Sequence, residues 1–194
     1  MSSFEYVMVL VSIVVALAIA HLLTALGECV RRVRGKGEPI KLDAVFLLWV
    51  GYVLIWLISF WWWEFKYQEI VAAWSFGLYL FVIGYAISLF MWAEILVPYR
   101  MKGVTDTYVD FRDGRKWFFG MLILIEVIDT FDSYFKGTEW VLRPASIGII
   151  VFTTAIAIVG FASERQKVQL GVAIIAFSSQ LLWVFVELGV LGSW

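Results

Sequence analysis

The chain has 194 residues and a net charge of −1 at pH 7, and 62% of its residues are hydrophobic while only 16% are charged. A soluble domain carries about a quarter charged residues and under half apolar ones. A chain of this size has too much exterior to hide such an excess of apolar side chains. The composition therefore excludes an ordinary soluble protein and predicts an integral membrane protein.

Six segments are long and apolar enough to cross a bilayer, which takes about 20 mostly apolar residues in a helix. Their lengths and the absence of strict alternation favour helices over the strands of a barrel. We therefore expect an all-α integral membrane protein with a single six-helix transmembrane domain over residues 1–194. The expected helices lie near residues 5–28, 43–64, 73–97, 117–136, 144–162 and 168–191.

Basic residues are concentrated in alternate loops. Loops 29–42, 98–116 and 163–167 hold twelve of the fifteen Lys and Arg residues. The positive-inside rule places these loops in the cytoplasm and both termini outside, in a plasma or inner membrane. Tryptophans near the membrane boundaries predict an aromatic belt. The belt would consist of Trp61, Trp62, Trp63, Trp74, Trp140 and Trp194 at the outer boundary and Trp117 at the inner one.

Three carboxylates, Glu126, Asp129 and Asp132, interrupt the fourth expected helix in the stretch LIEVIDTFD. Glu126 lies ~14 Å from the cytoplasmic boundary at 1.5 Å of rise per residue, which is near the midplane. A carboxylate at that depth costs several kcal/mol unless it faces protein or water, or binds a proton. We expect Asp132 to reach the outer surface, Asp129 to be intermediate, and Glu64 to reach the surface as well. Because no Lys or Arg is expected beside it, Glu126 would be protonated, pair with His21 or line a cation pathway.

His21 is the only histidine and falls in the inner third of the first expected helix. Its depth is within about one turn of Glu94 and Glu126, so these three side chains could form a cluster. A satisfied packing role for His21 is the alternative. The candidates for an ion or proton pathway are therefore Glu126, Asp129, His21 and Glu94. One histidine cannot supply a multi-histidine metal or haem site, and we expect neither a metal nor a cofactor.

Small residues recur every four positions along the first expected helix. Such a stripe is typical of a face on which transmembrane helices pack. The stripe consists of Ser12, Ala16, Ala20 and Thr24. We expect this face to contact another helix, and Ala18 to lie off it.

The sequence lacks a P-loop, a dinucleotide-binding glycine motif, an HExxH zinc motif and a GxSxG nucleophile elbow. Mixed charges in the loops predict no nucleic-acid partner. Three functions stay open. The chain could conduct or carry cations or protons, serve as a non-catalytic membrane assembly module, or act as a membrane enzyme or ligand binder that uses His21 with Glu94 or Glu126. A role other than catalysis is favoured. One copy has little room for a pore, so besides the lipid bilayer we expect a homo-oligomer or a partner membrane protein.

Overall fold

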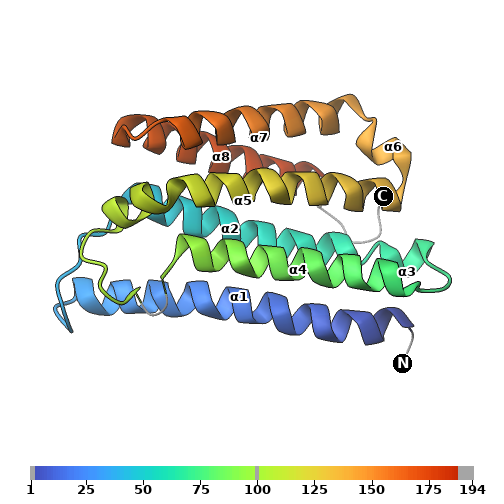
Figure 1. Ribbon diagram of the computed structural model, residues 1–194, viewed down its shortest axis with the longest axis horizontal. Helices are drawn as coiled ribbons and strands as arrows, with labels where there is room; N and C mark the ends of the chain where they lie inside the picture. Colours follow the sequence, from blue (N-terminus) through green and yellow to red (C-terminus); the bar gives the residue numbers. More distant parts are fainter. Residues whose placement is uncertain (1–2, 99–100, 188–194) are drawn as a thin grey trace.

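The computed structural model describes residues 3–98 and 101–187, and nearly all of these residues belong to helices. Six long helices run side by side in one bundle, each antiparallel to the next long helix along the chain (Figure 1). The long helices are α1 (Ser3–Val33), α2 (Ala44–Glu64), α4 (Phe76–Leu96), α5 (Thr107–Lys136), α7 (Pro144–Ala162) and α8 (Gln166–Glu187). Two short helices, α3 (Tyr67–Ile70) and α6 (Thr138–Val141), follow α2 and α5. Expected residues 188–191 of the last helix and Trp194 of the aromatic belt lie outside the described residues.

Five helices are long and apolar enough to cross a membrane. They span Ser3–Val33, Ala44–Ile70, Phe76–Leu96, Pro144–Ala162 and Gln166–Val186. The prediction of an all-helical chain with several membrane-length apolar helices is therefore confirmed. The remaining long helix, α5, carries the three acids of LIEVIDTFD and is too charged to meet this criterion. In Figure 1 it runs between α4 and α7, so other helices flank it.

Helix α5 begins at Thr107, ten residues before the expected boundary at residue 117. The cause is a helix cap that precedes the apolar run. The side chain of Asp106 accepts hydrogen bonds from the backbone N–H groups of Tyr108 and Val109, which satisfies two donors of the first turn. The Lys41 ammonium, 2.9 Å from the Asp106 carboxylate, holds the pKa of that carboxyl below its ordinary value through its hydrogen bond. Most of the expected loop 98–116 is thus helix.

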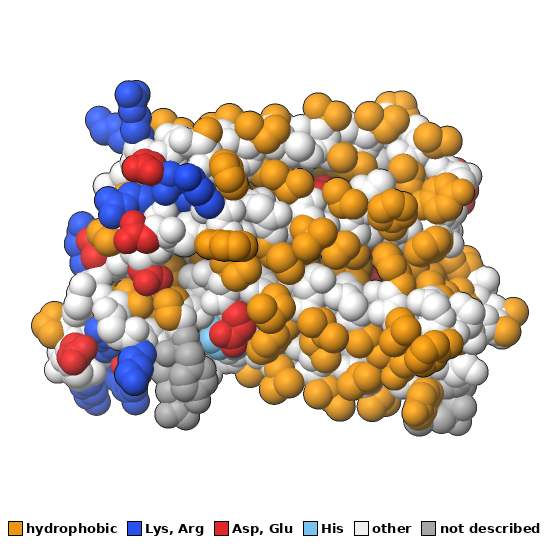
Figure 2. All heavy atoms as spheres, in the orientation of Figure 1, with side chains coloured by type: hydrophobic (Ala, Val, Ile, Leu, Met, Phe, Trp, Pro, Cys, Tyr) orange, Lys and Arg blue, Asp and Glu red, His pale blue; other side chains and the backbone are white. Residues whose placement is uncertain are grey.

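The connections between α1 and α2, between α4 and α5, and between α7 and α8 all lie at one end of the bundle (Figure 1). Figure 2 shows Lys and Arg side chains gathered at this end, while the rest of the visible face is largely hydrophobic. We call it the basic end, and the other the far end. The charge asymmetry that the sequence shows along the chain is therefore also an asymmetry in space.

A layer of aromatic side chains fills the bundle in the half nearer the basic end. Trp49 of α2 packs its ring 4.9 Å from Phe118 and 5.3 Å from Phe119 of α5, measured between centroids. Trp92 of α4 stacks on Phe118 at 5.3 Å. Phe111 also packs on these rings, and all of them are buried. This aromatic layer (Trp49, Trp92, Phe111, Phe118 and Phe119) closes the centre of the molecule on that side.

The small-residue stripe on α1 is not the face that packs inside the chain. Ala16, Ala20 and Thr24 are exposed, and Ser12 is half-buried, where it accepts a hydrogen bond from Trp61 Nε1 at 3.1 Å. A different set of apolar side chains packs on the neighbouring helices of the chain, and the contact of the stripe with another helix stays a prediction. The buried residues in the middle of α1 are Val11, Val15, Ala18, Leu22, Ala25 and Cys29. Their alternating spacing of four and three residues is the seam pattern of packed helices.

Candidate functional site

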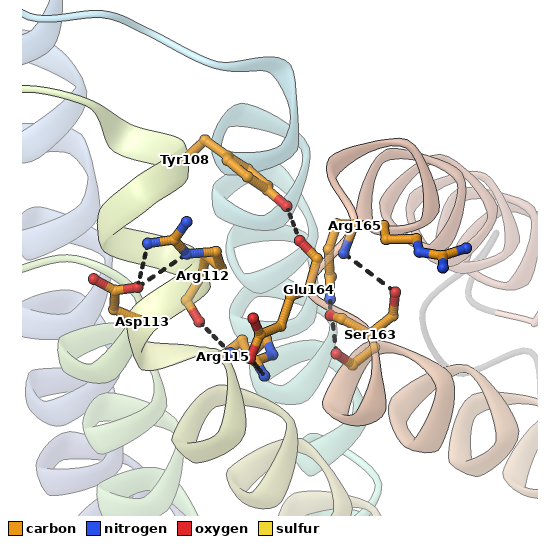
Figure 3. Close-up of polar contacts among 9 residues, drawn as sticks. Tyr108, Arg112, Asp113, Arg115, Ser163, Glu164 and Arg165 are labelled. Carbon is orange, nitrogen blue, oxygen red and sulfur yellow. Dashed lines mark hydrogen bonds and ion pairs between the residues drawn. The ribbon is translucent and has the colours of Figure 1, made fainter.

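Charged side chains at the basic end pair with one another. Arg115 of α5 forms an ion pair with Glu164 in the connection between α7 and α8. Figure 3 shows Tyr108, also from α5, reaching the same connection, where its hydroxyl donates to the Glu164 backbone carbonyl at 2.8 Å. Arg112 bonds the neighbouring Asp113. The contacts of Arg115 and Tyr108 hold α5 against the connection between α7 and α8, so the charges at this end have a structural role.

Buried Arg32 performs the same task at the end of α1. Its guanidinium donates to the backbone carbonyls of Glu38, Met101 and Val104 at 2.7–3.1 Å. Because one side chain satisfies three carbonyls, it holds the connection after α1 against the connection before α5. A basic residue of these loops therefore stabilises the fold, besides any part it has in orienting the chain in a membrane.

An acid-lined cavity of about 120 Å³ lies between α2, α5, α6, α7 and α8. It extends from Trp140 and Val141 on α6, at the far end, to Glu126 and Thr153 about halfway along α5 and α7. Its polar lining consists of Ser59, Glu126, Asp129, Thr130, Ser133, Ser146, Thr153 and Gln180. Its aromatic lining consists of Trp56, Phe60, Trp63, Trp140 and Trp183.

Glu126 is the deepest carboxylate in this cavity, and only 8% of the residue is exposed. It lies against the Thr153 hydroxyl of α7. Asp129 follows one turn nearer the far end and accepts a hydrogen bond from the Tyr85 hydroxyl of α4 at 2.7 Å. Tyr85 in turn accepts one from Trp56 Nε1 at 3.3 Å. Within the described residues, neither Glu126 nor Asp129 has a Lys, Arg or His partner in an ion pair.

Several neutral polar side chains also face the cavity without a protein partner. Ser59, Ser133, Ser146 and Gln180 line it, and their side chains make no hydrogen bond to any described residue. Polar groups in such a space are normally satisfied by water or a ligand. A single water needs roughly 10–15 Å³ of such volume, so this cavity has room for several. The lining is thus acidic and polar, and the cavity is large enough to hold water.

A second acidic group lies beside the cavity. The ammonium of Lys136 contacts both Glu64, at 2.7 Å, and Asp132, and all three side chains are 0% exposed. The Tyr67 hydroxyl donates to the other oxygen of Asp132 at 2.9 Å. We call Glu64, Asp132 and Lys136 the buried triad. The predictions that Glu64 and Asp132 reach the surface were wrong, because Lys136 and α3 cover them.

One pattern in the sequence points to the buried triad: Lys136 follows Asp132 by four residues, which puts both on one helix face. The contribution of Glu64 depends on the packing of α2 against α5, which no local pattern encodes. Tyr85 and Thr153 were also missed, since a lone Tyr or Thr in an apolar helix carries no signal of its own.

His21 and Glu94 meet between α1 and α4. The His21 Nδ1 atom is 3.3 Å from the Glu94 carboxylate, and its Nε2 atom is 2.8 Å from the Val97 carbonyl oxygen. Glu126 instead lines the cavity on the other side of α5, so the three-residue cluster is not formed. No group of three or more His, Cys, Asp and Glu side chains that could hold a metal ion occurs in the described part of the chain. Of the pathway candidates, the structure thus brings together Glu126 with Asp129, and His21 with Glu94.

The carboxylates around the cavity outnumber the cations. Asp129 lies close enough to Asp132 and Lys136 for their charges to interact, so the cavity and the buried triad form one electrostatic unit. This unit holds four carboxylates (Glu64, Glu126, Asp129 and Asp132) and one ammonium. Unless protons or cations bind, three negative charges remain uncompensated, which is costly away from bulk water.

At the far-end rim of the cavity, positive and negative side chains are more evenly matched. The Lys66 ammonium lies 3.4 Å from the centroid of the Trp140 ring, and the Arg143 guanidinium lies 3.7 Å from the same ring. Glu139 and Glu69 lie close enough to Lys66 to interact with its charge. The excess of carboxylates over cations is therefore confined to the cavity and the buried triad.

Comparison with known protein families, curated proteins and solved structures finds no match to this chain.

Proposed function

We propose that the chain is a multi-pass membrane protein that carries protons or small monovalent cations, with Glu126 and Asp129 as the binding groups. The observation that carries this proposal is the charge imbalance: four carboxylates share one buried ammonium beside a cavity with unpartnered polar groups. Buried acids within membrane helices typically mark ion or proton pathways.

In this proposal, α5 also crosses the membrane, which brings the number of crossings to six. The basic end faces the cytoplasm of a plasma or inner membrane. Both termini then lie outside. The gathering of Lys and Arg at one end supports this orientation (Figure 2). Exposed Trp61 at the far end and Trp117 nearer the basic end suit the expected aromatic belt. Trp63 and Trp140, in contrast, pack on each other at the rim of the cavity.

Carriage suits the geometry better than a permanently open pore in one copy. The cavity that Glu126 lines extends toward the far end, while the aromatic layer fills the bundle between Glu126 and the basic end. Transfer of a proton or cation from Glu126 to the basic end would require these rings to move, as in alternating access.

The second candidate is a non-catalytic assembly module, and one observation favours it. Ala16, Ala20 and Thr24 form an exposed small-residue face on α1, on which a helix of another copy or of a partner membrane protein could pack closely. The acids would then serve packing alone.

Flux through liposomes containing the purified chain tests the proposal. Proton, sodium and potassium flux is measured for wild type, Glu126→Gln and Glu69→Gln. We expect Glu126→Gln to abolish flux, because the amide keeps the shape and hydrogen bonding of the side chain but loses its charge. Glu69→Gln changes an exposed acid outside the cavity and should retain flux. Equal flux in both variants would refute the role of Glu126, and no flux in wild type would favour the assembly module.

A further inference from the structure

We infer that the acid-lined cavity binds a small organic ammonium, a ligand whose positively charged nitrogen sits between carboxylates and aromatic rings. This inference rests on the proposed function, since it names the class of cation that Glu126 and Asp129 would take.

The charge of the ligand follows from the cavity floor. Glu126 is more than nine-tenths buried, lines the cavity and has no ion-pair partner among the described residues. Asp129 shares the same wall and has one neutral donor, Tyr85. Two carboxylates one turn apart, without a protein cation between them, leave a place for one positive group.

The organic character of the ligand follows from the walls. Five aromatic side chains line the cavity, namely Trp56, Phe60, Trp63, Trp140 and Trp183. An ammonium is attracted to the face of such a ring, most strongly to Trp. The protein itself provides examples beside the cavity, since Lys66 lies over Trp140 and Lys136 lies 5.2 Å from the centroid of Trp63.

The carboxylates that line the cavity are fewer than a calcium site usually has. Calcium takes six to eight oxygen ligands, usually with several carboxylates. Only two carboxylates line this cavity, and no group of three potential acidic, His or Cys ligands occurs in the described residues. The cavity of about 120 Å³ has room for several waters at roughly 10–15 Å³ each, and so for a cation with a handful of non-hydrogen atoms.

Isothermal titration of the purified full-length chain in detergent with tetramethylammonium chloride tests the inference, with sodium chloride at equal ionic strength as the reference. We expect saturable tetramethylammonium binding that is at least tenfold weaker in Glu126→Gln. Trp183→Leu should weaken binding about 2- to 30-fold, the range of a cation–π contact. Trp183→Phe should restore most of the loss. Trp117→Leu is the matched control, because Trp117 is 76% exposed and lies outside the cavity, and it should bind like wild type.

Each variant is first shown to unfold with the same cooperative thermal transition as wild type, so that lost binding is not lost structure. Absence of tetramethylammonium binding in the folded wild type would overturn the inference, as would wild-type affinity in Trp183→Leu. Flux of protons or sodium without tetramethylammonium binding would overturn the ligand class and leave the proposed carrier standing. Binding with the expected pattern but without any flux would overturn carriage and leave the ligand class standing.

Discussion

At the scale of single residues, Lys136 is the side chain on which the acidic interior depends most. Among the described residues it is the one cation that forms ion pairs with Glu64 and Asp132, and one oxygen of Glu64 still lacks a hydrogen-bond partner there. A buried ion pair contributes little net stability compared with apolar side chains of similar shape. Removal of one partner is different, because it leaves the other charges buried and unpaired.

Lys136→Met should therefore destabilise the folded chain by about 3–5 kcal/mol, because Glu64 and Asp132 lose their shared ammonium. Thermal and denaturant unfolding in detergent measures the loss. Adding Glu64→Gln and Asp132→Asn to Lys136→Met should recover most of it, since no buried charge then remains unpaired. Lys102→Met, at an exposed site at the basic end, is the control and should be nearly silent. A stability of Lys136→Met equal to wild type would show that the buried triad is not ionised.

At the scale of helices, a glycine and an aromatic ring form one close contact between α7 and α5. Gly160 of α7 faces the ring of Phe119, and a Cβ atom built on Gly160 would overlap the ring carbon Cζ. The ring cannot easily retreat, because it is 0% exposed and packed within the aromatic layer. Gly160 is thus the residue that lets α7 approach α5 closely enough to cover Glu126.

Gly160→Ala should cost about 1–3 kcal/mol of stability through overpacking, despite the better helix propensity of alanine. Gly148 offers a matched control on the same helix, because no atom lies within 4 Å of the Cβ that an alanine would place there. Gly148→Ala should be neutral or slightly stabilising in the same unfolding measurement. Equal stability of the two variants would contradict the close approach of α5 and α7.

The helices themselves could be predicted from apolar length, and five of the six expected segments appear as membrane-length apolar helices. Which face of each helix is buried was harder to predict. In α1 nearly every position is apolar, so the seam through Val11, Ala18 and Ala25 was hidden beside a regular stripe of small residues. The depth of Glu126 was predicted from helix rise, and the structure buries it. The burial of Glu64 could not be predicted, because its cover comes from α5 and α3, whose approach depends on tertiary packing.

At the scale of the whole molecule, the orientation of every element depends on whether α5 crosses the membrane. Its 30 residues span ~45 Å at 1.5 Å per residue, enough for a full bilayer. It carries too many charges to be identified as a crossing by composition. Its acids are nevertheless turned away from lipid, since Glu126, Asp129 and Asp132 face the cavity and the buried triad. Helix α5 can therefore cross with its acids facing the protein, while Leu124, Val127 and Phe131 are exposed on its surface.

Accessibility of single introduced cysteines decides this, in a Cys29→Ser background that removes the one native thiol. Residues 36 and 138 are separated by α2, α4 and α5. If all three helices cross, Lys36→Cys and Thr138→Cys must react with a membrane-impermeant maleimide from opposite sides, Lys36→Cys from the cytoplasm. Gln166→Cys is separated from Lys36 by four crossings, α2, α4, α5 and α7, and should react from the same side as Lys36→Cys. Lys36, Thr138 and Gln166 are all exposed, so a failure to react would not stem from burial. Reaction of Lys36→Cys and Thr138→Cys from the same side would mean that only α2 and α4 cross between them, and α5 with its acids would then have to lie outside the membrane.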